Sequence, residues 1–261
     1  MSTRLAAAVS GSSERPPARP IPPSIELAWG LRRDGTRGPR RGLTLEAIVD
    51  AGIEVASVEG VGALSMARIA RQLEVGTMSL YRYVVSKDEL LTLMVDTGLG
   101  PPPEPAPGDW REGLTRWALG VREAYRRHPW SLKVPITTPP LGPNNVAWME
   151  DALAAMRDTP LTEPEKLSTL LLLSGFVRNA STLAADLAAG AAERPANMTY
   201  GRILSQLIDP ARFPAVHQAI AGGSLDDEDE DFEFDFQFGL DRILDGIERL
   251  IEPTGAVRPD G

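Results

Sequence analysis

The chain has 261 residues, 43% of them hydrophobic, and no cysteine. This composition suits two domains with a sizeable core and excludes disulfides, thiolate catalysis and cysteine-ligated zinc. The longest apolar stretch, residues 167–177, is far too short to span a bilayer, so we expect a cytoplasmic protein. The net charge of −9 is unevenly distributed: the first 100 residues carry 12 Lys and Arg against 11 Asp and Glu, and residues 101–261 carry 15 against 25. A basic end on an acidic body permits contact with a polyanion through that end only.

Residues 1–42 are rich in Pro, Arg, Ser and Gly and hold eight Arg against three acidic residues. This composition is typical of a flexible basic arm. A second interpretation stays open, because the arm contains an apolar group that could dock on the rest of the chain. Its members are Ile25, Leu27, Trp29 and Leu31.

Four helices are predicted in quick succession over residues 43–98. Thr44 and Ser65 are suitable N-caps for the first two, because their side-chain oxygens can accept from a free backbone N–H. A turn at 74–76 leads into a short third helix over 77–84. Together these helices predict an N-terminal domain.

The fourth helix opens with Ser86 and Glu89, which form a capping box. The Pro-rich stretch 101–107 then breaks the helical pattern and predicts a linker between domains. We place the second domain at 109–252.

Helical periodicity dominates this second domain. Asp109 begins a helix that His128 and the following Pro end, and Thr162 with Glu165 forms another capping box before a long helix. Near the C-terminus, phenylalanines alternate as in a strand, but a longer 4-4-3-4-3 spacing indicates a helix. No partner strand is predicted anywhere else, so the fold class is all-α.

Two of these helices are candidates for a dimer interface. The long helix carries small residues around Gly175, and the last helix carries one apolar stripe, which exceeds what a monomer normally leaves exposed. We expect them to form a four-helix bundle across a two-fold axis. The interface residues are Gly175, Phe236, Leu240, Ile243, Ile247 and Leu250.

Residues 64–84 form a short helix, a tight turn and a second short helix. In this helix-turn-helix arrangement, the second helix enters the major groove while the first crosses the backbone. Side chains on the second helix can reach base edges or phosphates, and Lys87 can bind a phosphate at the start of the next helix. The residues assigned to DNA binding are Ser65, Arg68, Thr77, Met78, Ser79, Tyr81, Arg82, Tyr83 and Lys87. For Tyr83, packing against the first helix is an equally good interpretation.

The segment ALSMARIARQLEVGTMSLYRYVVSKDELL resembles the DNA-binding domain of the tetracycline-repressor (TetR) family over residues 40–97. Residues 109–251 are similar to the C-terminal domain of the same family, more loosely, through HPW and FEFDFQFGLDRILDGIERL. The resemblance implies a homodimer, a palindromic operator and an effector pocket in the C-terminal domain. It also implies that Thr77, Ser79 and Arg82 read bases, whereas phosphates are held by Ser65, Tyr81 and Lys87.

Two positions depart from the family pattern. Glu74 stands at a turn position that is usually glycine, and a positive φ there adds strain on the order of 1 kcal/mol. Ala67 replaces a long polar side chain that contacts bases in some relatives. Both departures leave the operator sequence open.

The expected effector pocket lies among aromatic and polar residues of the second domain: Trp117, Trp148, Phe176, Arg178 and Asn179. For the three aromatic residues, a place in the hydrophobic core is the alternative. Arg178 lies on a mostly apolar helix, and a buried guanidinium needs an acidic partner. That partner is either an acidic ligand or one of the carboxylates Glu150 and Asp151.

The chain has only two histidines, His128 and His217, and neither has a carboxylate at a ligand-like spacing. We therefore expect no metal, no cofactor and no enzyme. An enzyme with a DNA-binding appendage and an architectural DNA-binding protein without an effector are the alternatives. The favoured function is a repressor that a small hydrophobic molecule releases by changing the spacing of two recognition helices.

Overall fold

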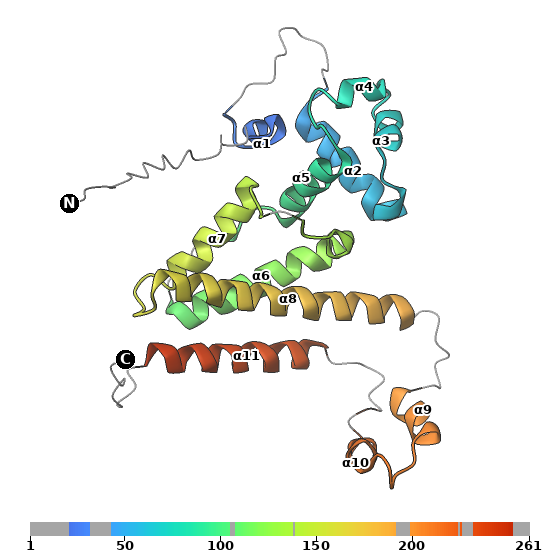
Figure 1. Cartoon of the computed structure of the whole chain (residues 1–261), viewed down its shortest axis with the longest axis vertical. Helices are drawn as coiled ribbons and strands as arrows, with labels where there is room; N and C mark the ends of the chain where they lie inside the picture. Colours follow the sequence, from blue (N-terminus) through green and yellow to red (C-terminus); the bar gives the residue numbers. More distant parts are fainter. Residues whose placement is uncertain are drawn as a thin grey trace, which may run out of the picture.

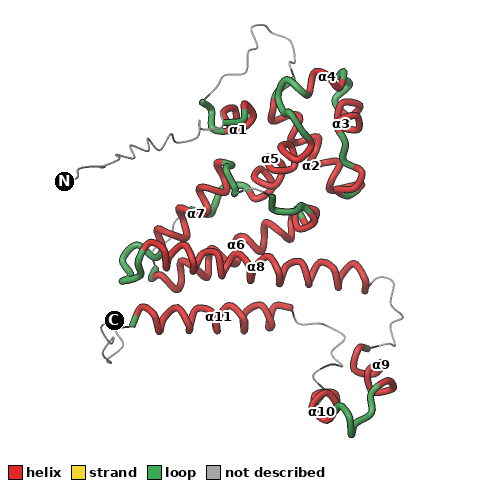
Figure 2. Tube along the Cα trace, viewed as in Figure 1, coloured by secondary structure: helices red, strands yellow, loops and turns green. Residues whose placement is uncertain are grey.

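The computed structural model describes residues 21–31, 43–104, 108–137, 139–191, 199–223, 225 and 232–252. Within these ranges every regular element is a helix (Figure 2), which confirms the predicted all-α class. None of the described helices is long and apolar enough to cross a membrane.

The N-terminal helices gather at one end of the molecule (Figure 1). Its core includes Ile48, Leu64, Ile69, Leu80 and Met94, which are at most 2% exposed. The elements at this end are α1 (Pro23–Ala28), α2 (Leu45–Glu59), the 3-10 turn η1 (Val61–Ala63), α3 (Met66–Gln72), α4 (Thr77–Leu80) and α5 (Lys87–Leu99).

The remaining helices form a larger body, with α8 and α11 side by side (Figure 1). Leu114, Leu173, Leu240 and Leu244 are fully buried in its core. The elements are α6 (Trp110–Arg127), the 3-10 turn η2 (Pro129–Lys133), α7 (Pro143–Ala155), α8 (Glu163–Ala191), α9 (Tyr200–Leu207), α10 (Pro214–Ala221) and α11 (Phe232–Ile251). The C-terminal phenylalanines thus lie on a helix, as the longer helical spacing of apolar residues predicted, and not on a strand.

The predicted caps are formed at the N-terminal end. Thr44 accepts from the Ala47 amide at 3.2 Å, and Ser65 accepts from the Arg68 amide at 3.1 Å. The capping box at α5 is altered, because the Glu89 carboxylate accepts from the Val85 amide rather than from that of Ser86. Each bond satisfies a backbone N–H that the helix itself leaves without a partner.

Residues 21–31 do not behave as a tail. In α1, Ile25 is buried and Ser24 donates to the Glu89 carboxylate. The Trp29 indole N–H donates to the Leu141 carbonyl at 2.8 Å, just before α7. The docking interpretation is therefore correct for this segment, and the rest of the predicted arm lies outside the described residues.

The buried carboxylate of Asp96 connects the N-terminal helices with the larger helical body. Asp96, on α5, is 4% exposed and lies at the N-terminus of α7. It accepts from the Asn145 amide at 2.8 Å and side-chain nitrogen at 2.6 Å, and from the corresponding groups of Asn144 at 3.3 Å. The N-cap of α7 is Gly142, which has no side chain of its own to cap the helix. Asp96 caps α7 in its place, and a Cβ on Gly142 would collide with the Asp96 carboxylate at 2.1 Å.

Candidate DNA-binding face and effector site

The turn between α3 and α4 brings two short helices together within a few residues. Glu74 has a φ of 55°, in the left-handed region, and is the non-glycine residue of the described chain with a positive φ. The Val75 amide donates to the Ala70 carbonyl at 2.9 Å, which closes the turn. The strain expected at Glu74 is therefore present, because the turn geometry requires this φ.

The recognition helix is shorter than predicted and exposes a polar face. α4 ends at Leu80, which is fully buried. Within the described part of the chain, no hydrogen bond engages the side chains of Thr77, Ser79 and Arg82. These groups are free to meet a partner outside the subunit.

Four further residues predicted to contact DNA border this face. Met78 is 78% exposed, and Tyr81 is 43% exposed. Ser65 is the N-cap of α3, so its hydroxyl oxygen is used by the helix while its O–H can still donate. Lys87 is the first residue of α5, where free amides and a positive charge coincide.

Arg68 and Tyr83 both have partners within the subunit, and their assignment to DNA stays a prediction. The Arg68 guanidinium pairs with Glu59 at 2.6 Å and donates to Gln72 at 2.8 Å. The Glu59 carboxylate holds the pKa of Arg68 above its usual range. The Tyr83 hydroxyl donates to the Leu43 carbonyl, so its proton is not available for a phosphate oxygen.

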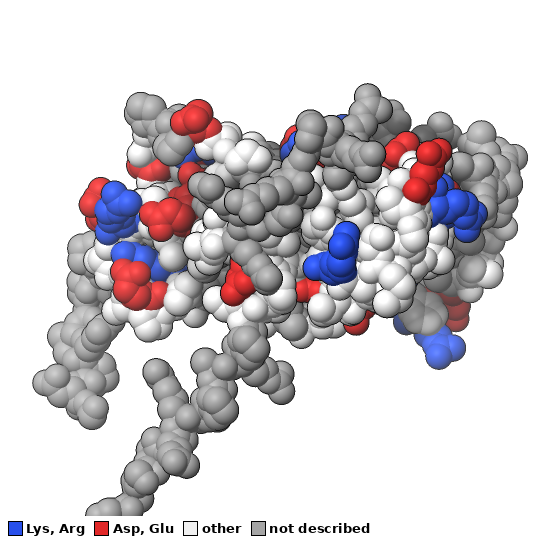
Figure 3. All heavy atoms as spheres, turned by 90° about the horizontal axis from the view of Figure 1, so that it is seen from above, with Lys and Arg blue, Asp and Glu red and all other residues white. Residues whose placement is uncertain are grey.

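Basic side chains do not form a continuous field on the visible face of Figure 3. Among the described residues there, Lys and Arg alternate with Asp and Glu and are separated by uncharged surface. Affinity for DNA would then depend on a few cations at the helix-turn-helix rather than on a broad basic surface.

Trp117 and Trp148 lie in the hydrophobic core, which is the alternative that the sequence left open for them. Both are 4% exposed, and their rings meet edge to face with centroids 6.2 Å apart. The Trp117 indole N–H donates to the Trp148 carbonyl at 2.9 Å, and that of Trp148 donates to the Gly100 carbonyl at 2.8 Å. Both polar groups are thus satisfied inside the subunit, and Trp148 holds the end of α5.

The three predicted pocket residues on α8 lie in three different surroundings. The Phe176 ring packs on Phe236 at a centroid distance of 5.2 Å, and Asn179 is exposed. Arg178 contacts neither of the proposed carboxylates. It donates to the carbonyls of Leu132 and Val134 at 3.0 and 2.9 Å, so it fixes η2 against α8.

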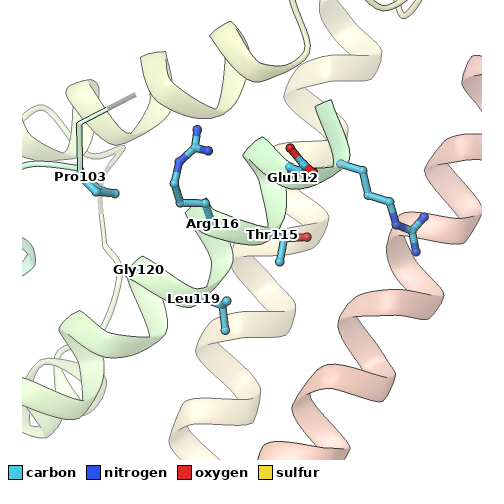
Figure 4. A pocket seen from close by; sticks show the side chains of 7 residues that line it. Pro103, Glu112, Thr115, Arg116, Leu119 and Gly120 are labelled. Atoms are coloured by element: carbon cyan, nitrogen blue, oxygen red, sulfur yellow. The ribbon is translucent and has the colours of Figure 1, made fainter. Parts of the chain in front are cut away.

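A groove of about 710 Å³ lies instead along the outer side of α6 and reaches the linker after α5 (Figure 4). It shares no residue with the predicted pocket. The aromatic side chains of the predicted pocket have other surroundings, because Trp117 and Trp148 lie in the core and Phe176 packs on Phe236. The lining residues are Pro103, Arg111, Glu112, Thr115, Arg116, Leu119 and Gly120.

The apolar stripe of α11, which was predicted to meet a partner helix, faces its own subunit in the single chain. Phe236, Leu240 and Ile247 are at most 3% exposed in the single chain, and Ile243 is partly buried. They pack on α8 and α6 and have no surface left for a partner. Leu250 and Gly175, in contrast, are exposed.

An apolar surface remains on the outward faces of α8 and α11. Leu171 is 74% exposed and Leu250 is 64% exposed. A Cβ added at Gly175 or Gly246 would meet no atom within 4 Å. We call this surface the outward seam; its residues are Leu171, Leu172, Gly175, Leu183, Phe238, Gly246 and Leu250.

Two family models match the chain. The model described as tetracyclin repressor-like, C-terminal domain, matches residues 102–251, and that of bacterial regulatory proteins, tetR family, matches residues 48–94. The chain belongs to the TetR family. It is therefore a transcriptional regulator with a helix-turn-helix, and not an enzyme.

Similar proteins share most of the length of this TetR-family chain. The HTH-type transcriptional repressor DrrR1 of Streptomyces coeruleorubidus is 38% identical over 252 residues, covering 93% of this chain and 91% of DrrR1. Among solved structures, ActR of Streptomyces coelicolor in complex with (S)-DNPA is 28% identical, with a TM-score of 0.68 over 80% of this chain and 99% of ActR. ActR in complex with actinorhodin is 26% identical, with a TM-score of 0.69 over 83% of this chain and all of ActR.

Proposed function

We propose that the protein is a ligand-responsive cytoplasmic repressor, which binds a palindromic operator as a homodimer and is released by a small hydrophobic effector. The observation that carries this proposal is the polar face of α4. Its side chains have no partner in the described part of the subunit, on a chain that belongs to a family of transcriptional regulators. We also propose the domain boundaries 43–98 for DNA binding and 109–252 for effector binding and dimerisation.

On the operator, Thr77, Ser79 and Arg82 read base edges, because α4 is the helix that a helix-turn-helix inserts into the major groove. An arginine can donate two hydrogen bonds to one guanine, which gives Arg82 the largest share of the discrimination. Lys87, with Ser65 and Tyr81, holds phosphates beside the groove and sets the register.

The homodimer forms through the outward seam. Its leucines are more exposed than a monomer normally leaves them, and its glycines allow a partner helix to approach closely. A two-fold axis through this seam makes the same surface meet itself and places two α4 helices on two half-sites. The palindrome of the operator follows from this symmetry.

Release requires an effector that binds better to a dimer state in which the two α4 helices no longer match the half-sites. ActR binds actinorhodin and (S)-DNPA. We infer that this chain responds to an effector of comparable size with a large apolar part.

The first experiment selects operators from a random duplex library and measures affinity by fluorescence anisotropy at several salt concentrations. Arg82→Ala weakens binding to the selected operator by about 1–3 kcal/mol. Lys87→Ala weakens binding to all duplexes and reduces the slope of log affinity against log salt concentration by about one. Arg126→Gln, at an exposed cation of the body, is the control and changes neither. If no operator is selected, or Arg82→Ala binds it normally, the proposal fails.

A second experiment tests the dimer and the effector. Wild-type protein runs as a dimer in light scattering, whereas Leu171→Asp runs as a folded monomer that has lost its operator affinity. Actinorhodin serves as the first effector probe and lowers operator affinity of the wild type. A wild-type monomer at micromolar concentration would contradict the two-half-site mechanism. Normal operator binding at all probe concentrations would favour an architectural DNA-binding protein.

A further inference from the structure

The groove along α6 has the volume of a ligand site, and it is lined by a cation that has no hydrogen-bond or ion-pair partner among the described residues. Its volume of about 710 Å³ lies within the range of about 300–1,000 Å³ for small-molecule sites. Leu119 and Pro103 provide apolar walls, and the Trp148 ring packs against Gly120, since a Cβ there would meet that ring at 2.6 Å. An apolar ligand body fits these surroundings.

The two arginines of the groove differ in their partners. Arg111 pairs with Asp245 at 2.6 Å and with Glu248 at 3.4 Å, so its charge is neutralised by α11. The Nε of Arg116 is buried and has no hydrogen-bond partner among the described residues. Figure 4 shows Arg116 extending from α6 on the side of Pro103, while Leu119 points to the other side. Among the described residues the Arg116 guanidinium forms no hydrogen bond or ion pair, so a ligand carboxylate in the groove can accept from its terminal N–H groups.

Asp151, on α7, is the neighbouring carboxyl group. Its Oδ2 is buried and, within the described ranges, without a hydrogen-bond partner. Burial raises the pKa of Asp151, and the Arg116 charge only partly offsets this effect. No hydrogen bond or ion pair joins the Asp151 carboxyl group to Arg116, although both residues lie in the described part of the chain, and the guanidinium keeps its capacity to bind an anion.

We propose that this groove binds an effector with an apolar ring system and one carboxylate, and that Arg116 recognises the carboxylate. The proposal rests on the proposed function and names the chemistry of its effector. Of the two arginines that line the groove, Arg116 alone has no ion-pair partner among the described residues, and Glu112 lines the same groove, so a singly charged acid fits better than a dianion.

The groove is also placed to affect the DNA-binding end. Pro103 follows Gly100 in the linker from α5 to α6, and the Gly100 carbonyl accepts from Trp148. The ring of Trp148 also packs closely against Gly120, which lines the groove. The hydrogen bond from Trp148 to Gly100 holds the C-terminal end of α5. A ligand that contacts Pro103 and Gly120 thus lies beside both partners of this bond.

The test uses 2-naphthoate and its neutral analogue 2-naphthamide as probes, with full-length protein and calorimetry. Wild-type protein binds the acid at least tenfold more tightly than the amide. Arg116→Gln removes this preference, because it lowers the affinity for the acid at least tenfold and leaves the affinity for the amide unchanged. Arg126→Gln, on the same helix outside the groove, is the matched control and keeps the preference.

Leu119→Glu provides a second variant at an exposed position, in case Arg116→Gln does not fold. It adds a negative charge to the groove wall and lowers the affinity for the acid but not for the amide. The inference is overturned if wild-type protein binds neither probe, or if neither variant changes the acid-to-amide ratio. Operator affinity without a probe is measured in parallel. A protein that binds its operator but not the acid contradicts this inference alone, whereas loss of all operator binding contradicts the proposed function.

Discussion

The recognition helix and the α8–α11 pair both expose a face that lacks a partner within the subunit, but the two faces differ in chemistry. α4 exposes hydroxyl and thioether groups over one buried leucine, and the guanidinium of Arg82 follows in the next turn. The outward seam exposes leucines, phenylalanine and glycines. A polar face of this kind remains solvated until it meets a polyanion, whereas an apolar face stays in contact with water only at a cost in free energy. The first therefore suits a reversible partner, and the second suits a permanent one.

The inner side of α11 makes the comparison sharper. It is as apolar as the outward seam, yet it is fully buried against α8 and α6. A substitution on the inner side of α11 should therefore affect the stability of the fold, whereas a substitution in the outward seam should affect association.

The largest effect is expected from Leu240→Ala on the inner side of α11. This side chain is fully buried, so its truncation lowers the free energy of unfolding by about 2–5 kcal/mol. Leu207→Ala, at a position 75% exposed on α9, changes it by less than about 0.5 kcal/mol. Urea unfolding followed by circular dichroism measures both. Equal effects would show that the inner stripe does not form the core.

The next effect concerns Asp96, where the DNA-binding end joins the body. Asp96→Ala leaves the amides of Asn144 and Asn145 without their acceptor and lowers the free energy of unfolding by about 1–3 kcal/mol. Hydrogen exchange should accelerate at the first turn of α7. Asp50→Ala, at an exposed site of α2, is the control. An unchanged exchange rate at α7 would contradict the role of Asp96 as its cap.

A smaller gain is expected at the turn of the helix-turn-helix. Glu74→Gly relieves the left-handed backbone and raises the free energy of unfolding by about 1 kcal/mol or less, because glycine also gains entropy in the unfolded chain. Glu74→Ala retains the strain and gives no gain. Thermal unfolding of the two variants decides; a gain for alanine as well would assign the effect to the lost carboxylate.

The smallest effect concerns His128, at the end of α6. Burial, and to a lesser degree the charge of Arg127, lower the pKa of His128 below its ordinary value of 6.5. The unfolded chain then binds the proton more strongly, so stability is full at neutral pH and falls as pH decreases below about 6.5. His128→Gln reduces this fall, measured as Tm between pH 7.5 and 5.5. A pH profile identical to that of the wild type would contradict the assignment.

Much of the DNA-binding end could be predicted from the sequence, because its structure depends on local signals. Thr44 and Ser65 cap their helices as expected, and the spacing of apolar residues predicted where α2 and α5 lie. The sequence did not indicate the ion pair of Arg68, and it left two interpretations open for Tyr83. Their partners, Glu59 and Leu43, face them only in the folded domain.

For the body, the helical segments could be predicted from the sequence, and so could the helix rather than strand at α11, since both follow from the period of the apolar residues. The side of α11 that faces inward, the core position of Trp117 and Trp148 and the groove beside Arg116 became evident only in the folded chain. The physical reason is that periodicity identifies an apolar side of a helix but not the element that covers it. That choice depends on packing between segments far apart in the chain, such as the close approach of Trp148 to Gly120.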